Sequence, residues 1–129
     1  MKGAIAGGHP LTAQAGAAVL EAGGSAVDAC IAASFASWVC ESPLTGPGGG
    51  GFMLVHLASD HKTRALDAYV ATPSGRGGEM EAIDVDFSGG STQVFRIGAA
   101  SVAVPGSLAG LEEAHRPRTG AGPHRCAGG

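Results

Sequence analysis

The residues that first suggest chemistry are four consecutive glycines, Gly48, Gly49, Gly50 and Gly51, in the stretch TGPGGGGFMLV. Each interior glycine costs roughly 0.5–1 kcal/mol relative to alanine, so the run needs a physical reason. A phosphate-binding loop requires a following helix whose N-terminus faces the anion. Here an apolar, strand-like segment follows, and it provides neither that helix nor the lysine of such loops. We therefore expect a backbone crossing too tight for side chains, with a smaller contribution to the wall of a cleft.

Other reactive side chains do not form a recognisable catalytic or metal-binding set. No two of the five histidines have the spacing of metal ligands on a helix: His9, His56, His61, His115 and His124. The three cysteines are odd in number and also lack metal-ligand spacing: Cys30, Cys40 and Cys126. The hydroxyl residues near turns are explained as caps or turn residues: Thr12, Ser42, Thr45, Ser74 and Ser107. From the residues alone we predict no catalytic group, metal or cofactor in this chain.

Composition places the chain among ordinary globular domains. It has 129 residues, 44 % of them apolar and 15 % charged, with a formal net charge of −3. This charge gives no support for binding to nucleic acid or to an anionic membrane. The start of the chain does not resemble a secretory signal, and the apolar segment 26–40 is too short to span a bilayer. We therefore expect a cytoplasmic protein without membrane partners.

Two helices are predicted in the first third of the chain. His9-Pro10 begins one that ends near Gly23-Gly24, and Ser25 begins the second with Asp28 as a capping-box partner. In the second helix Val27, Ile31, Phe35 and Trp38 or Val39 recur at helical spacing, and we expect this stripe to face a core. Residues 3–7 are predicted to form a short buried strand.

Two hairpins and a third helix follow. Residues 52–57 and 63–69 flank a polar turn, and residues 83–87 and 92–97 flank Ser88-Gly89-Gly90. Residues 99–104 are predicted as a further strand, and Pro105-Gly106-Ser107 begins a helix that ends near His115. The last residues, 116–129, are rich in arginine, proline and glycine, so a disordered tail is expected there.

Several of these motifs, in this order, resemble the gamma-glutamyltransferase family. The first elements are HPL at residues 9–11, AGGSAVDA at 22–29, and ESP at 41–43 with the glycine run and FMLV. ALD at 65–67 and VPGSLAGL at 104–111 continue the match. The resemblance covers residues 3–115 and corresponds to the N-terminal part of the family's large subunit. Domain 1–115 is thus expected to be gamma-glutamyltransferase-like, followed by a tail, 116–129, that is disordered or frame-shifted.

The resemblance implies an α+β fold, the αββα sandwich of N-terminal-nucleophile hydrolases, of which this chain would be a partial, N-terminal piece. In that family a self-cleaved precursor exposes a threonine that attacks gamma-glutamyl amides such as glutathione. The acyl group then passes to water or to an amine. No cofactor is implied. The threonine belongs to the small subunit, which this chain would need as a partner, so the chain is expected to be inactive alone.

The chain departs from the family pattern at the residue that holds the substrate's carboxylate. The family usually places an arginine shortly after the Leu-Asp pair, where this sequence has Tyr69. A tyrosine cannot form the bidentate charged pair of an arginine, so Tyr69 is a weak candidate and Arg76 a possible substitute. Two other interpretations stay open: a non-catalytic binding or regulatory subunit that pairs with a separate catalytic chain, and a small independent domain.

Overall fold

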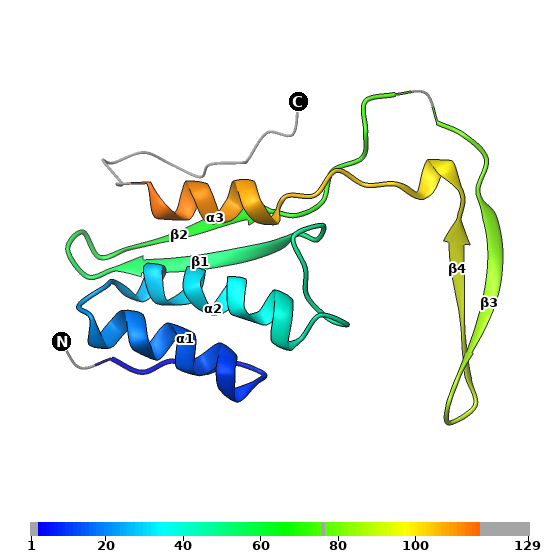
Figure 1. Ribbon diagram of the computed structural model, residues 1–129. Coiled ribbons are helices and arrows are strands. Elements are labelled where there is room, and N and C mark those ends of the chain that lie inside the picture. The colour runs from blue at the N-terminus through cyan, green and yellow to red at the C-terminus, as the bar shows by residue number, and fades with distance from the viewer. Residues whose placement is uncertain (1–2, 76, 117–129) are drawn as a thin grey trace.

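The structure, a computed structural model, describes residues 3–75 and 77–116. Three helices, two β-hairpins and a short 3-10 helix follow one another along the chain (Figure 1). Their bounds are α1 Pro10–Glu21, α2 Ala26–Cys40, β1 Gly51–Leu57, β2 Lys62–Ala68, β3 Glu81–Phe87, β4 Ser91–Ile97, η1 Ala99–Ser101 and α3 Ser107–His115. Within these described residues, every helix is too short or too polar to cross a membrane.

The predicted starts of α1 and α2 are confirmed in detail. Pro10 occupies the first turn of α1, and His9 Nδ1 accepts a hydrogen bond from the Leu11 N–H at 3.2 Å. At α2 the Ser25 hydroxyl accepts from the Asp28 N–H at 3.1 Å, while the Asp28 carboxylate accepts from the Ser25 N–H at 3.0 Å. This reciprocal capping box satisfies two backbone donors that a helix N-terminus otherwise leaves unpaired.

The side of α2 that packs is not the predicted one. Its buried residues are the small ones, Ala29, Ala33 and Ser37, whereas Phe35 is 47 % and Val39 81 % exposed. A Cβ on Gly16 of α1 would lie 2.9 Å from the Ala29 carbonyl oxygen, so the two helices are in close contact. Val27, Ile31 and Trp38 of the predicted stripe are half-buried, so that the most buried side of α2 is instead the one with small side chains, close to α1. A short helix–helix distance selects small side chains, which carry little hydrophobic periodicity.

The β1–β2 hairpin has one covered and one open face. The strands are antiparallel, with Met53 opposite Leu66 and Val55 opposite Arg64. Val55, Leu66 and Ala68 are buried, and Gly110 of α3 packs directly against the Ala68 and Leu66 side chains. The alternate residues Phe52 and Leu54 are 71 % and 74 % exposed. Since side chains alternate between the faces of a strand, α3 covers one face and the other is bare.

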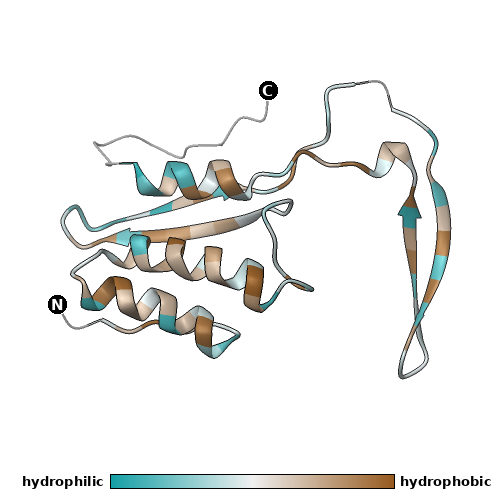
Figure 2. Cartoon of the chain, viewed as in Figure 1, coloured by the Kyte–Doolittle hydropathy of each residue, from teal (hydrophilic) through white to brown (hydrophobic). Residues whose placement is uncertain are grey.

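The β3–β4 hairpin stands apart from this body (Figure 1). The chain reaches it through an antiparallel bridge in which the Ala71 and Val104 backbones exchange hydrogen bonds of 2.8 and 3.0 Å. In Figure 2 apolar and polar residues alternate along β3, as expected for a strand with one apolar face, whereas β4, STQVFRI, does not alternate throughout. Every residue of β4 is exposed.

Two predicted strands are absent from the described part of the chain. Residues 3–7 have no strand partner there. Gly3 lies instead against the Leu20 side chain of α1, and the Ile5 side chain lies against Gly16 of the same helix. Residues 99–104 form η1 and contribute only the single bridge at Val104. Both segments have strand-like composition, but neither lies along a free strand edge. Of the predicted tail only residue 116 is described.

Candidate functional site

Three glycine-containing segments meet where β1 begins and β2 ends. The Gly49 carbonyl accepts hydrogen bonds from the N–H groups of Gly106, at 3.0 Å, and Ser107, at 3.1 Å. A Cβ on Gly50 would lie 2.5 Å from the Val70 nitrogen and 2.8 Å from the Ala68 oxygen. A Cβ on Gly106 would lie 2.2 Å from the same Ala68 oxygen. The backbone after β2 is therefore held between two glycines, neither of which has room for a side chain.

The rest of the glycine run is less constrained. An added Cβ would meet nothing within 4 Å at Gly48 or Gly51, and at Gly49 it would meet the Gly46 oxygen at an ordinary 3.4 Å. None of the four has a positive φ angle that requires glycine. The close approach foreseen for the whole run thus applies to Gly50.

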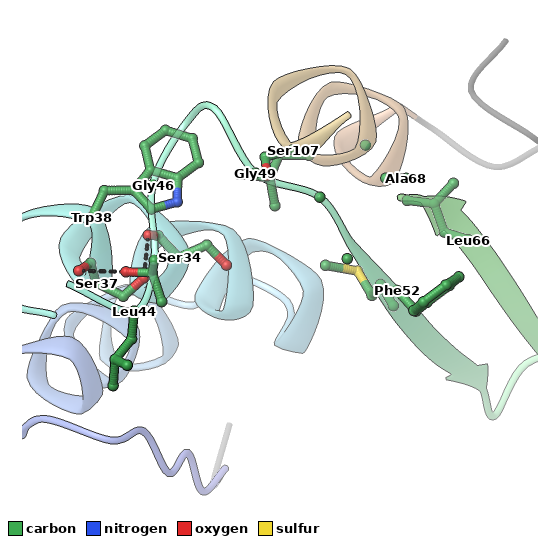
Figure 3. Close-up of a pocket in the computed structure, with 16 residues that line it drawn as sticks. Ser34, Ser37, Trp38, Leu44, Gly46, Gly49, Phe52, Leu66, Ala68 and Ser107 are labelled. Atoms are coloured by element: carbon green, nitrogen blue, oxygen red, sulfur yellow. Dashed lines mark hydrogen bonds between the residues drawn. The ribbon is translucent and has the colours of Figure 1, made fainter. Parts of the chain in front are cut away.

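The same junction forms part of a cavity of about 270 Å³ between α2, the hairpin and the start of α3 (Figure 3). Apart from the Trp38 indole, its polar side chains are hydroxyls, three of which donate to backbone carbonyls. Ser34 donates to Cys30 at 2.8 Å, Ser37 to Ser34 at 2.7 Å, and Thr45 to Ser37 at 2.8 Å. No acidic, basic or histidine side chain is among the described residues that line it. The cavity wall therefore supplies no proton-transfer group.

Beside the junction, Tyr69 lies on the open face of the hairpin. Its ring stacks on that of Phe52, with centroids 5.4 Å apart and planes inclined by 7°. Its backbone N–H donates to the Asp67 carboxylate at 3.1 Å. Tyr69 is 59 % exposed, so its ring and hydroxyl are accessible. Arg76, the other candidate from the sequence, lies outside the described residues.

The comparisons with known proteins decide the family. The model of the gamma-glutamyltranspeptidase family matches residues 12–120. This chain belongs to the gamma-glutamyltranspeptidase family. It is 39 % identical over 116 residues to a glutathione hydrolase proenzyme of Bacillus subtilis strain 168, a match that covers 87 % of this chain and 19 % of that protein. It is 37 % identical over 117 residues to the acylase ACY 1 proenzyme of Pseudomonas sp. strain SE83, with 88 % and 21 % covered.

Solved structures show the same fold. The Bacillus anthracis transpeptidase CapD has a TM-score of 0.68 at 32 % identity, covering 89 % of this chain and 33 % of that one. A gamma-glutamyltranspeptidase from Pseudomonas nitroreducens has a TM-score of 0.67 at 32 % identity, with 88 % and 32 % covered. The fold is that of the N-terminal-nucleophile hydrolases. The chain spans about a fifth of the length of the curated relatives it matches, in their N-terminal part.

The described residues contain two hydroxyl–histidine constellations, and neither has the arrangement of a nucleophile and base. Thr63 Oγ1 lies 3.0 Å from His56 Nδ1, but the two are exposed cross-strand partners with no carboxylate bonded to the ring. Ser25 donates to Asp28, which also contacts His115 at 3.1 Å. There the carboxylate lies between hydroxyl and imidazole, so the histidine cannot take the serine proton.

The electrostatics likewise indicate structural roles. The Ser25 hydroxyl and backbone, with a smaller effect of His115, lower the pKa of Asp28 below its ordinary value. The Arg64 guanidinium beside Asp60 lowers the pKa of that carboxyl. Among the described residues no group of three or more His, Cys, Asp or Glu side chains is arranged to hold a metal ion. Both carboxylates stabilise turns or helix starts rather than a reacting atom.

Sequence reasoning did not place Phe52 beside Tyr69. The strand register carries this information: Phe52 lies opposite Asp67, and Tyr69, two residues after Asp67, lies diagonally across the same face. That register cannot be read without knowing where the hairpin turns. The role of Tyr69 at the family's carboxylate-binding position stays a prediction.

Proposed function

We propose that this chain supplies the N-terminal part of a gamma-glutamyl transferase or hydrolase and that its catalytic threonine lies outside the described residues. The observation that carries the proposal is the family match over residues 12–120, combined with relatives about five times as long. The relatives are named as glutathione hydrolase and acylase proenzymes. We transfer to this chain the role of a precursor segment that acts on a gamma-glutamyl amide.

The open face of the β1–β2 hairpin supports this proposal. Phe52, Leu54 and Tyr69 are each more than half exposed there, although the opposite face is packed by α3. Burying a large apolar side chain contributes about 1.5–3 kcal/mol, so leaving several exposed forgoes a substantial part of a domain's stability. In a sandwich this face is covered by a second sheet. A small independent domain would be expected to bury these side chains in its own core.

The proposed reaction is acyl transfer. The threonine hydroxyl attacks the gamma-carbonyl carbon of the substrate, its proton passes to the threonine's own amino group, and the amine of the amide leaves with that proton. Water or a second amine then takes the gamma-glutamyl group from the threonine oxygen. In the described residues we find no alternative nucleophile with a base, so the chain alone is expected to be inactive.

A chimaera tests the proposal. Residues 1–115 of this chain replace the matching region of the Bacillus subtilis glutathione hydrolase proenzyme, and turnover of a chromogenic gamma-glutamyl amide is measured. We expect the chimaera to cleave itself into two chains and to release the chromophore, while the 129-residue chain alone does neither. Protein-dependent turnover by the 129-residue chain alone would overturn the proposal. A folded chimaera that fails to cleave would show that these residues do not serve as the family segment.

A further inference from the structure

We propose that two copies of this chain associate edge to edge through β4, so that their β3–β4 hairpins form one four-stranded antiparallel sheet. The two β4 strands pair around a twofold axis at Val94, the midpoint of Ser91–Ile97. The surface lies on the hairpin that stands apart from the rest of the structure (Figure 1). Its assignment is independent of the function proposed above.

The two edges of this hairpin differ in their protection against pairing. β3 and β4 form a two-stranded sheet, so each has a row of backbone groups without a strand partner among the described residues. Charged residues on an edge strand discourage pairing with another chain. β3 carries Glu81, Asp84 and Asp86, and two β3 strands paired about their midpoint would place two Asp84 carboxylates opposite each other. β4 has no acidic residue, lysine or proline, its register is uninterrupted and all its residues are exposed, so its edge is open to a further strand.

Geometry selects one register for the pairing of two β4 strands. A twofold axis perpendicular to the sheet pairs residues of the same face, and only an axis at Val94 pairs all seven residues of the strand. Val94 then lies opposite Val94 of the second copy. In the single chain Val94 is 59 % exposed. The other residues of its face are mostly polar: Ala82, Asp84, Asp86, Thr92 and Arg96. The pairing therefore covers an apolar side chain that is otherwise open on a polar face.

The same register brings opposite charges together between the copies. Arg96 lies opposite Ala82 in its own hairpin and has no ion pair within the described part of the chain. In the paired sheet it lies opposite Thr92 of the second copy, whose hydroxyl donates to the Asp86 carboxylate at 2.7 Å. Arg96 and that Asp86 are two strand spacings apart, about 10 Å, which their extended side chains bridge. By symmetry the sheet contains two of these ion pairs.

Cross-linking locates the twofold axis. In a background with alanine at Cys30, Cys40 and Cys126, the full chain carries Val94→Cys and is treated with a short bismaleimide at several protein concentrations. The Cβ atoms of the two cysteines would be about 5 Å apart, so we expect a covalent dimer whose yield saturates with concentration. Thr92→Cys is the matched control on the same face of the same strand. Its two copies would be about 14 Å apart, and we expect little covalent dimer. Equal yields from the two variants would overturn the proposal.

A charge exchange tests the ion pairs. The dissociation constant of the dimer is measured by sedimentation equilibrium for chains that carry Leu54→Glu, so that the bare face of the β1–β2 hairpin does not contribute. Arg96→Asp and Asp86→Arg each remove both symmetric pairs, and we expect either to weaken dimerisation about two- to thirtyfold. The double variant should restore the original dissociation constant.

Such a rescue would have to come from contact between copies. Within one hairpin Arg96 and Asp86 are four positions apart along the strands, about 14 Å, which is too far for an ion pair. A double variant that dimerises no better than the single variants would overturn the proposal. A chain that stays monomeric at every concentration would also overturn it and would leave the β4 edge to a strand from another segment or partner.

Discussion

Replacing Gly50 with alanine tests the glycine junction most sharply. The added methyl group would lie 2.5 Å from the Val70 nitrogen, 2.8 Å from the Ala68 oxygen and 2.8 Å from the Tyr69 carbonyl carbon. All three are backbone atoms, so no side-chain rotation relieves the contact, and β2 or the glycine run must move. Overpacking of this kind typically costs about 1–3 kcal/mol of unfolding free energy.

Gly48→Ala is the matched control, two residues away in the same run. Nothing lies within 4 Å of its added Cβ, and its φ angle is not positive, so alanine restricts mainly the unfolded chain. That restriction stabilises a protein by about 0.4–1 kcal/mol. The two variants are therefore expected to differ by about 1.5–4 kcal/mol, with opposite signs relative to the wild-type chain.

Urea unfolding measures this difference, with the fluorescence of Trp38, the only tryptophan, as the signal. Because the urea dependence of small proteins is about 1–3 kcal/mol per molar, the midpoints of the two variants should separate by roughly 0.5–4 M. If the urea midpoints of Gly50→Ala and Gly48→Ala differ by less than about 0.3 M, the close backbone contact does not exist in solution.

Three further predictions concern the helix start, acid and the open face. Ser25→Ala should lower the unfolding free energy by about 1 kcal/mol in the same urea experiment, because it removes the α2 cap; an unchanged midpoint would contradict the capping box. The pKa values of Asp28 and Asp60 are lowered on folding, so their stabilisation is complete above the ordinary value of 3.8 and is lost as the pH falls below it. Asp28→Asn should therefore flatten the acid dependence of the urea midpoint, and an equally steep loss would refute its contribution. Leu54→Glu should reduce concentration-dependent self-association in sedimentation velocity; identical profiles would show that the open face does not mediate it.

Much of the local structure could be predicted because its signals are local. The Pro10 start of α1, the Ser25–Asp28 capping box and the polar turns of both hairpins each depend on neighbouring residues alone. The strand predicted at residues 3–7 fails for the opposite reason, since a strand exists only beside a partner that local composition does not reveal.

Packing and the candidate site depended on contacts between distant segments. The periodicity of α2 identified its large apolar residues, but contact with Gly16 requires small ones, so Ala29 and Ala33 are buried instead. The glycine run indicated a close crossing, but only the structure shows that Gly50 makes it against the chain after β2. The Phe52 ring stacks on the Tyr69 ring because of the strand register, and that register depends on the position of the turn.

Hydroxyl-radical footprinting of the dilute, monomeric chain tests most directly whether these residues are part of a larger fold. In that case one face of the β1–β2 hairpin is covered in this chain and the other is open. The measurement compares oxidation rates of side chains on the two faces of the β1–β2 hairpin. Phe52, Leu54 and Tyr69 should be oxidised readily, whereas Val55 and Leu66 on the opposite face should be protected. Equal protection of both faces in the monomer would show that the hairpin is already enclosed and needs no further segment.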